Sequence, residues 1–200
     1  RVSIRNYHSP DTRGYNCGFR LACSTETSPT PIPTPEPTTI PNNEIWYTST
    51  DGKVVTPNAT DVFGVNIVSN TYENGKGAIK FDGKVTQIGE SAFNKCTTLS
   101  TIEIPSSVNT IGGWPFTECS SLSEFRGKFA SEDKRCLIVD GRLAAFAPKG
   151  ISSYTVSDNV SIITSGAFSS CSALQYITIP DSVTSVESGA FVGCSKLRAF

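Results

Sequence analysis

Apolar and polar positions alternate in several short stretches of the chain, and each stretch predicts a structural element. The run Leu99-x-x-Ile102-x-Ile104-Pro alternates apolar with polar residues and is rich in β-branched side chains, which predicts a short, half-buried strand. Pro105 has no N–H group to donate to a sheet ladder, so it ends this strand. The stretch SGAFSSC at 165–171 is too short for a stable helix. We expect one helical or 3₁₀ turn there, with its apolar side chains inward.

The same pattern returns at fixed intervals along the chain. Copies begin at Val85, Val108, Val160 and Val183, and three columns of apolar residues share one spacing of 23, 52 and 23 residues. The columns are Phe93, Phe116, Phe168 and Phe191; Cys96, Cys119, Cys171 and Cys194; and Leu99, Leu122, Leu174 and Leu197. A period in the twenties is typical of a solenoid, in which each coil buries its apolar face against its neighbours. We therefore expect a repeat solenoid with short parallel strands stacked about 4.8 Å apart.

The cysteine column has three possible explanations. Cysteine behaves as a small apolar residue and is often buried, so it fits a tight slot where leucine would overpack. Cysteines of neighbouring coils could instead form disulfides, although a solenoid gains little stability from them. A zinc site needs close cysteine or histidine pairs, whereas each repeat supplies one cysteine and His8 is the only histidine. Core packing is the favoured interpretation.

The segment before the repeats has two distinct compositions. Residues 25–43 hold six prolines among threonines, which predicts an extended, semi-rigid linker. From 44 to 84 the chain becomes rich in β-forming residues, and two hairpins are expected. One covers 44–55 and turns at Asp51-Gly52, and the other turns at Asn74-Gly75. Together they predict an N-terminal β-hairpin cap over the solenoid core, with Trp46 and Tyr47 as its packing anchors.

The wide spacing between Cys119 and Cys171 marks an interruption of the repeats, which otherwise run over 85–200. Its 52 residues equal one 23-residue coil plus 29 more. The sequence around Asp140-Gly141 again predicts a hairpin, so we expect a variant hairpin coil at about 128–159. Within it, we expect Cys136, Leu137 and Val139 to alternate with polar neighbours, and Ile151, Tyr154 and Val156 to continue the core.

Composition and charge narrow the possible functions. The formal charge is −1 and no basic cluster occurs, which argues against nucleic acid as a partner. No apolar run approaches the roughly 18 residues of a membrane helix, so no membrane insertion is expected. The repeats contain no histidine and no nucleophile motif, and ENGKG at 73–77 lacks the spacing of a phosphate loop. We expect no catalytic residue, no cofactor and no metal site in this segment. The chain starts at Arg1 and has no methionine, so we expect a piece of a longer protein.

The polar positions of the expected strands form a candidate binding surface. The outward residues are Thr101, Glu103, Glu124, Arg126, Ser153, Thr155, Tyr176 and Thr178. They combine mixed charges, hydroxyls and one exposed aromatic ring, a set suited to recognition of a protein or a glycan. An ordinary solvated sheet face is the alternative interpretation of each residue.

The repeats resemble a known family. IGESAFNKCTTLSTIEIPSSVNTIG and its later copies are similar to the BspA-type leucine-rich repeat pattern over about 85–200, and the interrupting coil resembles a variant coil of such proteins. At Trp114-Pro115 the alanine before the phenylalanine is replaced, so that turn is expected to differ. The resemblance implies a leucine-rich-repeat-like, right-handed solenoid with a curved sheet. It also implies a surface-exposed or secreted bacterial protein with a role in adhesion to host proteins or other cells.

Residues 1–23, within an expected tail segment at 1–24, resemble the closing stretch of formylglycine-generating-enzyme-like (sulfatase-modifying factor) domains. The residues that carry this resemblance are Arg5, Asn16, Gly18, Phe19 and Arg20. Nothing in the segment matches the catalytic cysteine pair of that family, and Cys17 stands where the family usually has an aliphatic residue. The resemblance implies the tail of a truncated enzyme-like domain, which by itself cannot catalyse a reaction.

Two functions follow from these patterns. The first is a non-catalytic binding or adhesion module of a bacterial surface or secreted protein, which recognises a protein or glycan partner, of host or other origin, through the strand face. The second is a structural spacer that displays a formylglycine-generating-enzyme-like domain, and in that case the activity of the full-length protein lies in the displayed domain.

Overall fold

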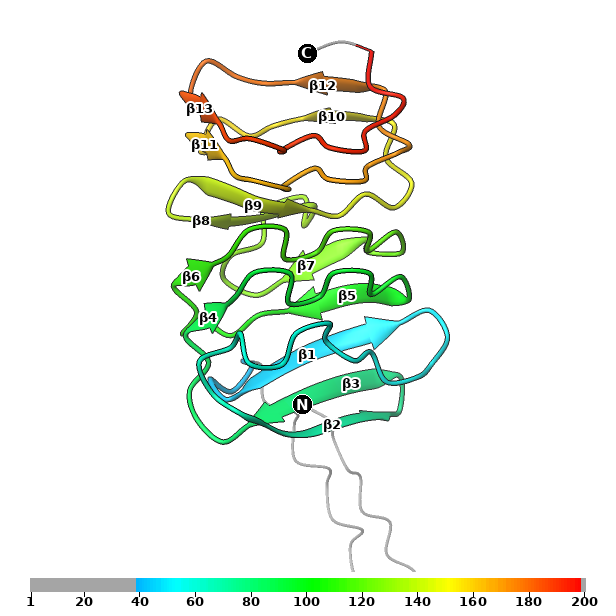
Figure 1. Ribbon diagram of the computed structural model, residues 1–200, viewed down its shortest axis with the longest axis vertical. Helices are drawn as coiled ribbons and strands as arrows, with labels where there is room; N and C mark the ends of the chain where they lie inside the picture. The colour runs from blue at the N-terminus through cyan, green and yellow to red at the C-terminus, as the bar shows by residue number, and fades with distance from the viewer. Residues whose placement is uncertain (1–38, 199–200) are drawn as a thin grey trace, which may run out of the picture. The chain divides into compact units, whose positions relative to one another are not determined.

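The computed structural model describes residues 39–198, so the 1–24 tail and most of the 25–43 linker lie outside it. The described chain winds into stacked coils (Figure 1). Short strands form the sides of the coils, and their bounds are β1 (Glu44–Ser49), β2 (Ile67–Glu73), β3 (Lys76–Phe81), β4 (Gln87–Ile88), β5 (Leu99–Glu103), β6 (Thr110–Ile111), β7 (Glu124–Arg126), β8 (Cys136–Val139), β9 (Arg142–Phe146), β10 (Ser153–Thr155), β11 (Ile162–Ile163), β12 (Tyr176–Thr178) and β13 (Ser185–Val186). The predicted repeat solenoid is confirmed.

The N-terminal end of the stack is an antiparallel sheet that continues into the first parallel strands. The strand order is β2-β3-β1-β5-β7, with β1 antiparallel to both β3 and β5, and β5 parallel to β7. The hairpin β2–β3 turns at Asn74-Gly75, where both residues have positive φ (51° and 79°), as a type I′ turn requires. The predicted hairpin over 44–55 is wrong, because β1 pairs with β3 and β5 and no strand follows Asp51-Gly52 before β2.

The two predicted anchors of the cap point in opposite directions, as successive residues of a strand must. Tyr47 is buried, and its hydroxyl donates to Asn70 Oδ1 (2.7 Å) and accepts from the N–H of Val55 (3.1 Å). Trp46 lies half-buried on the outer face, where its indole N–H donates to Glu44 (2.6 Å). The packing role is therefore correct for Tyr47 and wrong for Trp46.

The coils beyond the cap carry strands on two sides. On one side, which we call the strand face, lie β5 and β7 and then the parallel pair β10–β12. On another side lie the parallel pair β4–β6 and the sheet β8-β9-β11-β13. Figure 1 shows that both series follow the stack from the cyan end to the red end.

The predicted helical turn is wrong, since residues 39–198 contain no helix. The backbone N–H groups of 167–171 donate alternately within their own coil and to the next coil. The N–H of Cys171 donates to the carbonyl of Phe168 within the coil (3.2 Å), whereas the N–H of Phe168 donates to Ala190 of the next coil (2.9 Å). Ser170 has a φ of 61°, which is incompatible with a right-handed helix. This ladder of turns joins neighbouring coils as a sheet does.

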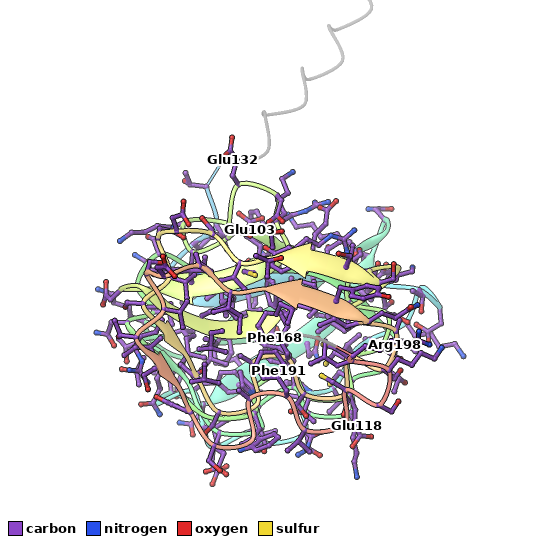
Figure 2. The ribbon with its side chains drawn as sticks, turned by 90° about the horizontal axis from the view of Figure 1, so that it is seen from above. Glu103, Glu118, Glu132, Phe168, Phe191 and Arg198 are labelled. Atoms are coloured by element: carbon purple, nitrogen blue, oxygen red, sulfur yellow. The ribbon has the colours of Figure 1, made fainter. Side chains whose placement is uncertain are left out.

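The repeat columns form the core, as predicted. The phenylalanine, cysteine and leucine positions of the first three copies are buried, and those of the last copy, Phe191, Cys194 and Leu197, are half-buried. Figure 2 looks down the stack and shows Phe168 and Phe191 near its centre.

The hairpin β8–β9 divides the core in two. Leu137, Val139 and Ala144 pack with the cap and the first two repeats, while Cys136, Leu143 and Phe146 pack with the last two. The expected alternation with polar neighbours is only partly correct, because Ile138 is half-buried against the second cluster. A strand covered on both faces needs apolar side chains at successive positions. The hairpin of the variant coil therefore forms an internal wall, a layer that packs against a separate core cluster on each of its two faces.

Candidate functional site

The predicted outward residues lie on the strand face in two separate groups. In one group, which we call the charged patch, Thr101 lies opposite Glu124 and Glu103 opposite Arg126 on β5 and β7. In the other, which we call the hydroxyl patch, Ser153 lies opposite Tyr176 and Thr155 opposite Thr178 on β10 and β12. The strands β7 and β10 belong to different sheets, so the structure places the eight residues on two patches rather than on one continuous surface.

The charged patch extends onto the cap. Arg126 donates to Glu124 Oε2 from Nε and Nη2 (3.2 and 3.1 Å), which partly neutralises both groups. The hydroxyls of Thr48 and Thr101 lie 2.8 Å apart across β1 and β5, and Trp46 lies opposite Glu103. Lys76 places its ammonium 3.2 Å from the centroid of the Trp46 ring.

Sequence reasoning missed Trp46 as a member of this surface because it treated both aromatic residues of EIWYTS as core. The signal was present, since Ile45 and Tyr47 have the period-2 spacing of one face and Trp46 belongs to the other. Figure 2 shows Glu103 projecting from the strand side of the stack and Glu118 from the opposite side.

The hydroxyl patch differs in its chemistry. Its four side chains carry hydroxyl groups and no charge, and the Tyr176 side chain is the most prominent feature, with 49% of its surface exposed. An exposed tyrosine on a strand offers a large apolar ring and a hydroxyl group with little conformational freedom to lose on binding. The patch is thus able to bind a partner by ring contact and hydrogen bonding.

The cysteine column has a packing role with a polar component. The thiol of Cys119 donates to the carbonyl of Phe93 in the preceding coil (3.0 Å), and the thiol of Cys194 does the same to Phe168 (3.0 Å). The thiol of Cys96 donates to the carbonyl of Thr56 in the cap (3.4 Å). A serine would satisfy the same carbonyl but would fill the apolar slot less well, which explains why this position suits cysteine.

The buried thiols of Cys96, in this column, and of Cys136, in the variant hairpin, are poor nucleophiles. Burial raises the pKa of the Cys96 thiol to about 11 and that of the Cys136 thiol to about 12. All five cysteines among residues 39–198 are free, and this part of the chain contains no group of three His, Cys, Asp or Glu side chains that could hold a metal ion. His8 lies outside the described residues. Nor does 39–198 contain a helix with the length and apolar character needed to cross a membrane.

A hollow lies beside the hydroxyl patch, where the variant coil interrupts the strand face. Its volume is about 400 Å³, and its lining residues, which define what we call the strand-face hollow, are Ser131, Glu132, Asp133, Tyr154, Thr155, Ser157 and Asn159. Of these, only Thr155 belongs to the predicted set. The sequence could not reveal the hollow, because it depends on how residues 127–135 pass between β7 and β10.

Comparison with models of protein families identifies the family to which the repeats belong. Six copies of the model described as "BspA type Leucine rich repeat region" match residues 65–132 and 142–200. The match starts before Val85 and resumes at β9, leaving out residues 133–141 with β8, and its six copies exceed the four copies expected from the sequence. It does not include residues 1–24, whose resemblance to formylglycine-generating-enzyme-like domains stays a prediction. None of the curated proteins compared with the chain matches it.

Three solved structures are similar to this chain. A leucine rich cell surface protein from Faecalibacterium prausnitzii A2-165 is 30% identical over 57% of this chain and 32% of its own, with a TM-score of 0.45. A leucine-rich repeat protein from Bacteroides ovatus ATCC 8483 is 27% identical over 72% of this chain and 44% of its own, with a TM-score of 0.35. A T. pallidum leucine rich repeat protein is 19% identical over 60% of this chain and 75% of its own, with a TM-score of 0.29.

This chain spans about a third of the F. prausnitzii protein and less than half of the B. ovatus protein. The family model, in contrast, covers more than half of the present chain, and its repeats coincide with the stacked coils of the fold. The chain belongs to the BspA-type leucine-rich repeat family.

Proposed function

We propose that this chain is a non-catalytic binding module, surface-exposed or secreted, that recognises a protein partner through the strand face. The observation that carries the proposal is the contrast between the two directions in which its strand residues point. Inward positions repeat the same residue types from coil to coil, whereas the outward pairs vary: Thr101 and Glu103, then Glu124 and Arg126, then Ser153 and Thr155, and last Tyr176 and Thr178. Packing constrains the first set and leaves the second free to fit a partner.

The fold supports this function through its rigidity. Each strand of the face is held by its neighbours in the stack, so a partner meets a preformed surface and no loop needs to become ordered on binding. Tyr176 is the proposed anchor, because tyrosine is enriched among the residues that dominate binding energy at interfaces. Arg126 is the proposed polar contact, since its guanidinium is exposed and fixed by Glu124.

A search for the partner with this chain as bait tests the proposal. The full 200-residue chain is presented to a protein array and a glycan array, and each captured partner is titrated with Tyr176→Ala, Arg126→Ala and Glu118→Gln. Glu118 projects from the side opposite the strand face and serves as the control (Figure 2). We expect Tyr176→Ala to weaken binding about 30-fold or more, a hot-spot loss of 2 kcal/mol or more.

Other outcomes separate the alternatives. A protein partner whose affinity is unchanged in both strand-face variants would show that another surface binds. Capture of glycans alone would replace the protein partner by a saccharide. Capture of nothing would favour the structural spacer that displays a formylglycine-generating-enzyme-like domain.

A further inference from the structure

We infer that the strand-face hollow receives a lysine or arginine side chain of the partner protein, next to the contact made by Tyr176. The inference rests on the proposed function and specifies the chemistry that the partner must present. It concerns residues that neither the repeat pattern nor the candidate surface includes, apart from Thr155.

The hollow exists because one coil of the strand face is replaced by a loop. The N–H of Phe125 on β7 donates to the carbonyl of Lys134 (2.8 Å), so the loop covers the edge of β7. On the other side of the loop, β10 has a strand partner on one edge only, which is β12. The space between the turn at 131–133 and the free edge of β10 is the strand-face hollow. Its volume lies within the range of roughly 300–1,000 Å³ that is usual for ligand sites.

The charge of the lining is negative. Glu132 and Asp133 are exposed carboxylates, and no lysine or arginine is among the residues that line the hollow. The neighbouring cations in sequence, Lys134 and Arg135, do not line the hollow, and the guanidinium of Arg135 donates to the carbonyls of Ala147 and Lys149 (3.4 and 3.1 Å). Figure 2 shows Glu132 projecting from the strand side of the stack.

One of these carboxylates is held in a fixed position. Asp133 Oδ1 accepts from the hydroxyl of Ser131 (2.6 Å) and from the N–H of Arg135 (3.0 Å). Burial acts to raise the pKa of the Asp133 carboxyl, but hydrogen bonds from Ser131, Arg135 and Tyr154 outweigh it and leave the pKa below its usual value. Asp133 is therefore ionised at neutral pH, and its orientation is set before any partner arrives.

The rest of the lining also suits a cationic side chain. The hydroxyls of Thr155 and Ser157 and the amide of Asn159 offer oxygen acceptors around the two carboxylates. Ammonium and guanidinium groups have only donors, so each of these oxygens can accept from them. An apolar side chain would leave the oxygens without partners, and an anion would be repelled.

The hollow is continuous with the proposed binding surface through Thr155. This residue lines the hollow and also belongs to the hydroxyl patch, where Thr178 lies opposite it and Tyr176 lies opposite Ser153. A partner chain that contacts the Tyr176 ring therefore passes within one strand of the hollow. The two sites would bind neighbouring residues of the same partner.

The test uses small probes and the full chain, so it does not depend on finding the partner. The ¹⁵N-labelled chain is titrated with N-acetyl-lysine methylamide and N-acetyl-arginine methylamide, and in parallel with N-acetyl-glutamine methylamide and methyl glucoside. We expect saturable shifts in the amide signals of 131–135 and 155–159 with the two cationic probes only. Glu132→Gln should weaken the binding about two- to five-fold, the usual range for an exposed ion pair. Asn159→Asp, which adds a carboxylate, should strengthen it by a similar factor.

Glu118→Gln is the control, because Glu118 projects from the opposite side of the stack and does not line the hollow. If the control weakens binding of the cationic probes as much as Glu132→Gln does, the probes are attracted by general negative charge and the inferred site is wrong. Shifts with the glucoside and not with the cations would make it a saccharide site, which also contradicts the inference. Absence of shifts with every probe would refute it outright. The function proposed for the strand face has a separate test, capture of a partner through Tyr176, so failure of one is distinguishable from failure of the other.

Discussion

The two pairs of regular coils, 85–127 and 160–198, have the same local structure and a different degree of burial. In the first pair the rings of Phe93 and Phe116 stack with centroids 5.3 Å apart, and in the second those of Phe168 and Phe191 stack at 5.0 Å. Yet Phe93 and Phe116 are both buried, whereas Phe191 is half-buried. The first pair lies between the cap and the hairpin β8–β9, while the second has the hairpin on one side only among the described residues.

This difference shows that a repeat sets the direction of its side chains but not their burial. The same column residue contributes its full hydrophobic stabilisation only when a coil lies on both sides of it. Substitutions at different positions of one column should therefore lower the free energy of unfolding by different amounts.

The largest effect is expected at Phe168, which packs against Phe146, Tyr154 and Phe191. Phe168→Ala should lower the free energy of unfolding by about 3–5 kcal/mol, the usual cost of emptying a buried aromatic site. Phe191→Ala, which removes the same ring one coil later, should cost only about 1–2 kcal/mol because part of that ring is already in water. Equilibrium unfolding in urea measures both, and equal losses would contradict the comparison.

Cysteine reactivity should differ by about two orders of magnitude between Cys96 of the first pair and Cys194 of the second. With the pKa of Cys96 raised to about 11 by burial, its thiolate fraction at neutral pH is about 100-fold lower than for an ordinary thiol with a pKa of 9.0. A hydrogen-bonding contact with Cys171 instead lowers the pKa of Cys194, which is half-buried. Under native conditions a thiol reagent should therefore modify Cys194 long before Cys96, as read by mass mapping. After unfolding in urea the two rates should converge, and faster native labelling of Cys96 would disprove the packing account.

The pairs also differ at the position where β6 and its counterpart β11 end. Gly112 approaches the preceding coil so closely that an added Cβ would lie 2.5 Å from the backbone nitrogen of Glu90. The counterpart in the second pair, Thr164, has room for a side chain, whose hydroxyl donates to the carbonyl of Leu143 (3.1 Å). Gly112→Ala should cost about 1–3 kcal/mol through overpacking, because backbone atoms must move. Thr164→Ala should cost about 1 kcal/mol through one lost hydrogen bond, and a larger loss there than at Gly112 would contradict this account.

The smallest effect concerns alkaline pH. Because the pKa of Cys96 is higher in the folded chain than in the unfolded chain, its stabilising effect is complete below pH 9 and is lost as the pH rises towards 11. The free energy of unfolding should therefore fall more steeply over this interval in the wild type than in Cys96→Ala, by about 1 kcal/mol once partial exposure is considered. Urea titrations at pH 8 and pH 10.5 measure the difference, and parallel curves would show that Cys96 does not contribute.

Much of the fold follows from periodicity alone. The columns of Phe, Cys and Leu predict the solenoid and its core, and Asn74-Gly75 and Asp140-Gly141 predict their hairpins, because both signals depend on residues close together in sequence. The hairpin predicted over 44–55 is wrong because β1 instead makes long-range pairs with β3 and β5, which no local signal reveals. The outward position of Trp46, in contrast, follows from the alternation of Ile45 and Tyr47. The predicted helical turn failed because the turns bond to the next coil, a contact that one repeat does not reveal.

The candidate surface was predictable only in part. Alternation along β5, β7, β10 and β12 identifies the outward side chains, but it does not show that they form two patches. The strand-face hollow depends on the path of the loop before β8, where no periodic signal exists. Its lining residues are ordinary loop residues in sequence and meet only in the folded chain.

The wall formed by β8–β9 has a mechanical consequence for a protein that carries load. Coils that stack like those described here peel from an end one at a time under tension, since each is held mainly by the next. The hairpin is joined to both halves by different side chains, Val139 and Ala144 on one side and Leu143 and Phe146 on the other. When stepwise unfolding reaches the hairpin, the contacts on both of its faces must break together. A pull on either end should therefore extend the chain in two stages, with a pause at the hairpin that leaves the remaining half intact.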